Sequence, residues 1–98
     1  MNSYYFILEV EPQLENPLIA NVSRAVAHIW VLATDIDEAR DVVLRFLKSD
    51  RWEATEEKDA YLLTPERIAG LGTEELSNYQ AAQSEGIHAK FYYWHRSE

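Results

Sequence analysis

The chain has 98 residues, of which 47% are hydrophobic and 27% are charged, and it contains no cysteine. A chain of this length and composition folds as one domain, residues 1–98, and the lack of cysteine excludes disulfides and zinc ribbons. Its 17 acidic and 9 basic residues give a formal net charge of −8, which disfavours nucleic acid and anionic membrane surfaces as partners.

The first residues, MNSYYFILEVEP, carry neither a basic leader nor an apolar run long enough to span a membrane, so we expect a cytoplasmic location. Residues 3–10 are rich in aromatic and β-branched side chains and predict a first strand. Residues 25–34, AVAHIWVLAT, form a nearly continuous apolar run that is typical of a central strand. The connection at 11–24 is long for a hairpin and contains several apolar residues, so we expect it to pack against the domain.

A helix is predicted directly after the second strand. Asp35 stands in the N-cap position and Glu38 follows three residues later, which is the spacing of a capping box. Apolar residues then recur at helical spacing, with charged residues opposite them. These apolar positions are Ile36, Ala39, Val43, Phe46 and Leu47.

The second half of the chain predicts two further strands and an interrupted helix. We expect a strand at 51–56, a turn at 57–59 and a short extended piece that ends at Leu63. Thr64 and Pro65 mark a helix start. Glycines at 70 and 72 interrupt this helix before it resumes at 73, and Gly86 ends it ahead of a last strand that begins at 87.

This order of elements predicts an α+β fold. We expect a mostly antiparallel sheet of four to five strands, with two helices, the second of them broken, packed on one face. Helices approach most closely where side chains are small, which favours the face of the second strand that carries Ala27 and Ala33.

Aromatic side chains gather on the other face of the predicted sheet. Side chains alternate in direction along a strand, which assigns five candidate residues to this open face. A soluble monomer rarely exposes a large apolar patch, so another protomer, a ligand or the 11–24 segment should cover it. The candidate interface or ligand residues are Tyr5, His28, Trp30, Tyr92 and Trp94.

Motifs for catalysis or metal binding are missing from the sequence. The histidines, at 28, 88 and 95, lack the helical i, i+4 spacing of a metal site, although His28 and His88 would meet if their strands pair in the right register. No nucleophile elbow or phosphate-binding glycine loop is present. We therefore expect no metal, no cofactor and no catalytic residues.

Three segments, VLATDIDEARDVVLRFL, WEATEEKDAYLLTPE and NYQAAQSEGI, resemble small bacterial proteins classed as domains of unknown function. The shared pattern is a strand that ends in alanine, a helix that opens with Glu-Ala, a Trp-Glu strand and a late helix before Gly-Ile. It covers roughly residues 29–88. The resemblance implies no activity and no catalytic residues.

These observations lead to three hypotheses about function. The first is a small non-catalytic interaction protein that forms a homodimer through the aromatic sheet face, with Trp30 and Trp94 as interface anchors. The second is a ligand-binding or enzymatic dimer with an aromatic-lined pocket on that face, in which His28 or His88 supplies the polar or acid/base group. The third is an acidic inhibitor or immunity-type protein that binds a basic partner through carboxylates at 53–59 and 74–75.

Overall fold

Four long strands form one antiparallel sheet. The computed structural model describes residues 1–96 and contains the strands β1 (Asn2–Pro12), β2 (Val22–Ala33), β3 (Trp52–Leu62) and β4 (Ile87–His95). They lie in the order β3-β1-β2-β4, and each neighbouring pair is antiparallel. The two most apolar strands therefore occupy the centre of the sheet, and the predicted α+β class is confirmed, with four strands.

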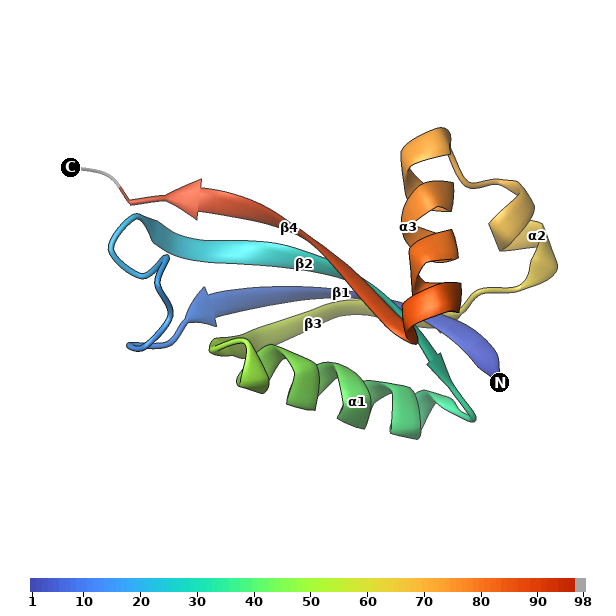
Figure 1. Cartoon of the computed structure of the whole chain (residues 1–98), viewed down its shortest axis with the longest axis horizontal. Helices are drawn as coiled ribbons and strands as arrows, with labels where there is room; N and C mark the ends of the chain where they lie inside the picture. The colour runs from blue at the N-terminus through green and yellow to red at the C-terminus, as the bar shows by residue number, and fades with distance from the viewer. Residues whose placement is uncertain (97–98) are drawn as a thin grey trace.

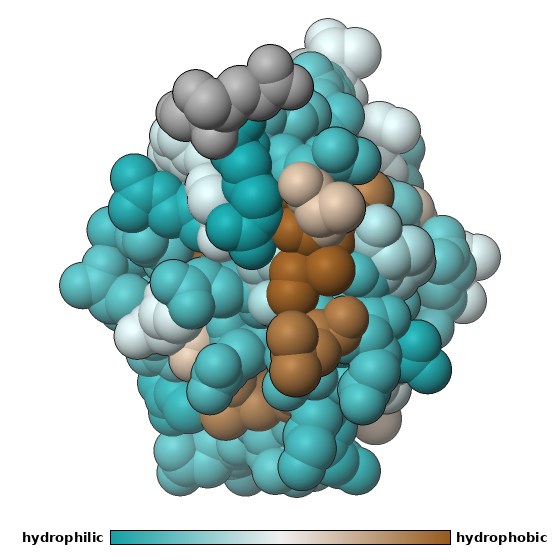
Figure 2. Space-filling model, turned by 90° about the vertical axis from the view of Figure 1, so that its left-hand side faces the viewer, coloured by the Kyte–Doolittle hydropathy of each residue, from teal (hydrophilic) through white to brown (hydrophobic). Residues whose placement is uncertain are grey.

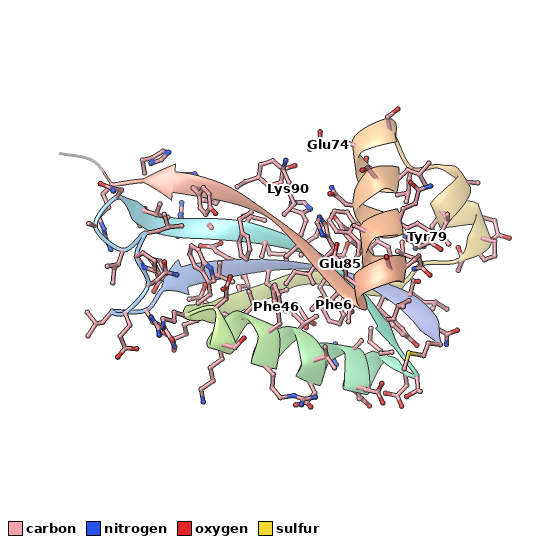
Figure 3. All side chains as sticks on the ribbon, in the orientation of Figure 1. Phe6, Phe46, Glu74, Tyr79, Glu85 and Lys90 are labelled. Atoms are coloured by element: carbon pink, nitrogen blue, oxygen red, sulfur yellow. The ribbon has the colours of Figure 1, made fainter. Side chains whose placement is uncertain are left out.

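Helix α1 (Ile36–Ser49) covers one face of the sheet, as Figure 1 shows. The Asp35 carboxylate accepts a hydrogen bond from the Glu38 backbone N–H at 2.8 Å, which confirms the predicted N-cap. The buried side chains of α1 pack against the face of β2 that carries Ala27 and Ala33. Phe6 and Phe46 lie between the sheet and this helix (Figure 3).

The second predicted helix is broken as expected. It consists of α2 (Pro65–Ala69) and α3 (Thr73–Glu85). The Thr64 hydroxyl accepts from the Arg67 backbone N–H at 3.3 Å and caps α2. Gly86 ends α3 with a φ of 89°, a conformation that side-chain-bearing residues adopt only with strain, and the chain then enters β4.

The helices lie on both faces of the sheet, which corrects the expectation that they share one. Helix α1 packs beside Phe6 and Ile29, whereas α3 packs beside Tyr5 and Trp30. The two helices lie on opposite sides of the sheet (Figure 1). The buried Ala82 of α3 belongs to this second cluster. Part of the aromatic face is thus covered by the chain's own helix α3 rather than by the 11–24 segment.

The turn predicted at 57–59 is wrong, because β3 runs without a break through these residues. The pairing of β3 with β1 shifts register twice, so that Thr55 and Lys58 are the extra residues of two β-bulges. Charged side chains fit here because β3 is an edge strand with an exposed face. One of them, Glu57, forms an ion pair at 2.8 Å with Arg40 of α1.

The long connection between β1 and β2 is packed, as predicted. Asn16 within it is only 3% exposed, and its side chain donates to the Arg51 carbonyl at 3.0 Å and accepts from the Leu18 N–H at 2.9 Å. This connection lies at the end of the molecule remote from α2 and α3 (Figure 1). Figure 2 views that end, where a central run of hydrophobic surface lies among hydrophilic side chains.

None of the helices within residues 1–96 combines the length and the apolar character that a membrane crossing requires.

Candidate functional site

A pocket of about 500 Å³ lies between the sheet and the first turns of α3. Its floor is made by side chains from the three strands β1, β2 and β4, and its wall by the N-terminal part of the helix. The floor residues are Tyr5, His28, Trp30 and Tyr92, and the wall residues are Gly72, Thr73, Glu74, Glu75 and Asn78.

Four of the five side chains assigned to the aromatic face from the sequence meet in this pocket. Tyr5 and Trp30 are paired across β1 and β2, with ring centroids 5.0 Å apart. His28 and Tyr92 come from β2 and β4, and their ring centroids are 5.2 Å apart in an edge-on arrangement. Strand alternation is what brings these side chains to the same side of the sheet.

Tyr5 and His28 are joined by a hydrogen bond between the Tyr5 hydroxyl and His28 Nδ1. Burial lowers the pKa of His28 below its ordinary value, so the imidazole is neutral at pH 7. Burial also raises the pKa of Tyr5, so its hydroxyl stays protonated. With the imidazole proton assigned to Nε2, Tyr5 donates to Nδ1, and the pair forms an uncharged, hydrogen-bonded unit of the pocket floor.

Trp30 is the most deeply buried residue of the floor, at 3% exposed. Its indole N–H has no hydrogen-bond partner within residues 1–96. A buried donor without a partner costs about 1–3 kcal/mol. The chain therefore keeps a polar group unsatisfied beside the pocket.

Two neighbouring carboxylates stand at the N-terminal end of α3. Glu74 forms an ion pair with Lys90 of β4 at 3.2 Å, and Figure 3 shows both residues on the α3 side of the sheet. Glu75 has no cationic partner within 4.0 Å among the described residues 1–96. Its negative charge contributes to raising the pKa of Tyr5 and opposes the lowering of the pKa of His28.

Trp94, the fifth predicted residue, does not line the pocket. It lies near the far end of β4, is 43% exposed and has the Arg24 guanidinium 4.9 Å from its ring centroid. Arg24 in turn forms an ion pair with Glu9 at 3.1 Å. Trp94 thus belongs to a separate surface cluster on the same sheet face.

The histidines do not form a pair. Strands β2 and β4 are neighbours, but their register places His28 opposite Lys90 and His88 opposite Trp30. Nδ1 of His88 lies 3.8 Å from the Glu85 carboxylate. Over residues 1–96, no group of three or more histidine or carboxylate side chains is arranged to hold a metal ion.

The helix wall of the pocket was missed from the sequence, where Glu74 and Glu75 were assigned to an acidic docking surface for a basic partner. A signal was nevertheless present. Three partly apolar positions of this helix, Leu76, Tyr79 and Ala82, recur every three residues and form a narrow stripe. Of these, Tyr79 and Ala82 pack with Tyr5 and Trp30 in the structure.

No protein-family model, curated protein or solved structure matches the chain. The resemblance to small bacterial domains of unknown function therefore stays an interpretation of the sequence.

Proposed function

We propose that this chain is a small-molecule binding protein whose ligand occupies the pocket between the sheet and α3. The observation that carries the proposal is the pocket floor, where Tyr5, His28, Trp30 and Tyr92 converge from three strands. Ligand sites are concave, are lined by aromatic and apolar side chains, and contain a few fixed polar groups. A volume of about 500 Å³ is within the usual range of such sites.

The polar groups of the floor support this proposal. The hydrogen bond between Tyr5 and His28 fixes both side chains, and a fixed site loses less conformational entropy when it binds a ligand. Trp30 adds its ring to the floor, and its indole N–H is buried away from solvent.

The pKa shifts of the two hydrogen-bonded floor residues, Tyr5 and His28, favour ligand binding over acid/base catalysis. A general acid or base works best when its pKa is near the operating pH. Burial lowers the pKa of His28, which weakens it as a base, and raises the pKa of Tyr5, which weakens it as an acid. Both shifts move away from neutrality, so we assign these residues to ligand recognition.

Self-association through the aromatic face is less well supported. Trp30, expected as an interface anchor, is buried beneath α3 of its own chain and offers almost no surface to a partner. An acidic docking surface is also less favoured, because three of its carboxylates already have cationic partners. The pairs are Glu56 with Lys58, Glu57 with Arg40, and Glu74 with Lys90.

A pair of bulky substitutions on α3 tests the proposal. Asn78→Trp fills the pocket from its wall, whereas Ser77→Trp places the same side chain on the exposed neighbouring position, outside the pocket. Three probes of similar size would be used: 2-phenylethylamine, 2-phenylethanol and phenylacetate. We expect ligand-observed NMR to detect at least one probe on the wild type and on Ser77→Trp, with binding lost in Asn78→Trp. Failure of all three probes to bind the wild type, or equal binding to both variants, would refute the proposal.

A further inference from the structure

The charge around the pocket points to a class of ligand. On the basis of the proposed function, we infer that the ligand is an organic cation, in which an ammonium group is carried by an apolar body. The inference rests on the two carboxylates of the wall, on the aromatic rings of the floor and on the placement of the neighbouring cations.

The pocket lining carries negative charge and no positive charge. Its two carboxylates are those of Glu74 and Glu75, and no lysine or arginine among residues 1–96 lines it. Lys90 is not part of the lining, but its Nζ pairs with Glu74 at 3.2 Å and lies 6.0 Å from the ring centroid of Tyr92. His28 is neutral at pH 7 because burial lowers its pKa. The negative charge of Glu75, which has no cationic side-chain partner within 4.0 Å among residues 1–96, is left to attract a cation and to repel an anion.

The first turn of α3 would ordinarily favour an anion, because its free N–H groups carry the positive end of the helix dipole. Here the helix supplies its own anion. A Cβ atom at the N-cap residue Gly72 would lie 3.6 Å from Oε1 of Glu75, so this carboxylate is folded back over the helix end. The Glu75 carboxylate therefore already occupies the positive end of the helix dipole, and an anionic ligand would compete with it for the same site.

The aromatic floor adds a second attraction for a cation. Tyrosine and tryptophan rings attract ammonium and guanidinium groups through the negative potential of their faces. This chain uses the same interaction beside the pocket, where the Arg67 guanidinium lies 4.1 Å from the ring centroid of Tyr61. Tyr61 in turn contacts Tyr5 of the floor, with ring centroids 5.5 Å apart. The net charge of −8 further favours the approach of a cationic ligand.

The three probes of matched size distinguish this inference from the proposed function. We expect calorimetry to give 2-phenylethylamine the highest affinity, 2-phenylethanol a lower one and phenylacetate the lowest. Raising the salt concentration should weaken binding of the amine and leave the alcohol unchanged. Glu75→Gln should weaken amine binding by about two- to fivefold, because the lost ion pair is partly exposed, and should weaken alcohol binding less.

Substitutions at two further positions control for the net charge of the protein and for the aromatic ring of Tyr92. Glu85→Gln changes the net charge equally but is ten residues, or about 15 Å, further along α3, so it should leave amine binding unchanged. Tyr92→Leu should weaken amine binding and Tyr92→Phe should restore it, because Tyr92 is half exposed and its ring is the recognition element. Binding of the alcohol or the acid as tightly as the amine, or an equal effect of Glu75→Gln and Glu85→Gln, would overturn the cation inference alone. Absence of binding by every probe would overturn the proposed function as well.

Discussion

Replacement of Tyr5 by phenylalanine removes one hydroxyl from the pocket floor and keeps the ring that packs on Trp30. The lost hydrogen bond to His28 is worth about 1 kcal/mol, and the imidazole nitrogen left without its partner in a partly buried site adds up to about 1 kcal/mol. We therefore expect Tyr5→Phe to lower the free energy of unfolding at pH 7 by about 1–2 kcal/mol. Each kcal/mol corresponds to a fall in Tm of about 4–8 °C in a domain of this size.

The difference in free energy of unfolding between the wild type and Tyr5→Phe should also depend on pH. Because the folded state raises the pKa of Tyr5 above its ordinary value of 10.0, Tyr5 contributes stability that is present below pH 10 and is lost as the pH rises further. The loss has a limiting slope of about 1.4 kcal/mol per pH unit. Tyr5→Phe lacks this contribution, so the stability difference between the two proteins should narrow above pH 10.

Urea unfolding at about pH 7 and about pH 10.5 measures both effects. Tyr93→Phe is the matched control, because Tyr93 is 44% exposed and its ring stacks with Trp52 on the other face of the sheet. Its hydroxyl should contribute less than about 0.5 kcal/mol. Equal stability of Tyr5→Phe and the wild type at pH 7, or a difference that stays constant with pH, would contradict the role assigned to this hydroxyl.

Three further substitutions test other parts of the account. Asn16→Ala removes two hydrogen bonds of a buried side chain and should cost about 1–3 kcal/mol in urea unfolding; a cost below 0.5 kcal/mol would show that the β1–β2 connection does not depend on them. Gly86→Ala should cost about 1–2 kcal/mol because of its positive φ, whereas Gly72→Ala, at a φ of −71°, should cost much less, and equal costs would contradict the backbone argument. Because burial lowers the pKa of His28 below 6.5, its contribution to stability is present above pH 6.5 and is lost as the pH falls through the lowered pKa, so the wild type should lose more stability than His28→Gln between about pH 7 and pH 5. Parallel losses in the two proteins would mean that His28 does not titrate differently in the folded and unfolded states.

The sequence predicted the side of the sheet that carries the pocket because strand alternation is a strict geometric rule. Alternation places His28 and Trp30 on one face of β2. Tyr5 and Tyr92 join them because β1 and β4 pair with β2 in registers that align these faces. The contrast between small and large residues on the two faces of β2 also predicted where α1 packs.

The elements that complete the pocket depend on tertiary structure. Leu63 follows the end of β3 and packs against Trp30, so the chain leaves the sheet on the side that α1 does not cover, and α3 follows it there. No local sequence pattern specifies on which face of the sheet the chain continues after Leu63. The charges of β3 likewise indicated a turn, because the sequence does not show that Arg40 of α1 lies within reach of Glu57. Trp94 shares the face but not the pocket, since the position of α3 along the strands decides which aromatic residues it covers.

The most direct test of the pocket as a ligand site uses the three tryptophans of the chain, which occupy three different environments. Trp30 lines the pocket, Trp52 is buried on the α1 side of the sheet, and Trp94 is at the surface. Their indole N–H resonances would be followed by two-dimensional NMR of ¹⁵N-labelled protein during titration with 2-phenylethylamine. We expect a saturable shift of the Trp30 resonance, with those of Trp52 and Trp94 unchanged. An unchanged Trp30 resonance, or a shift confined to Trp94, would contradict it.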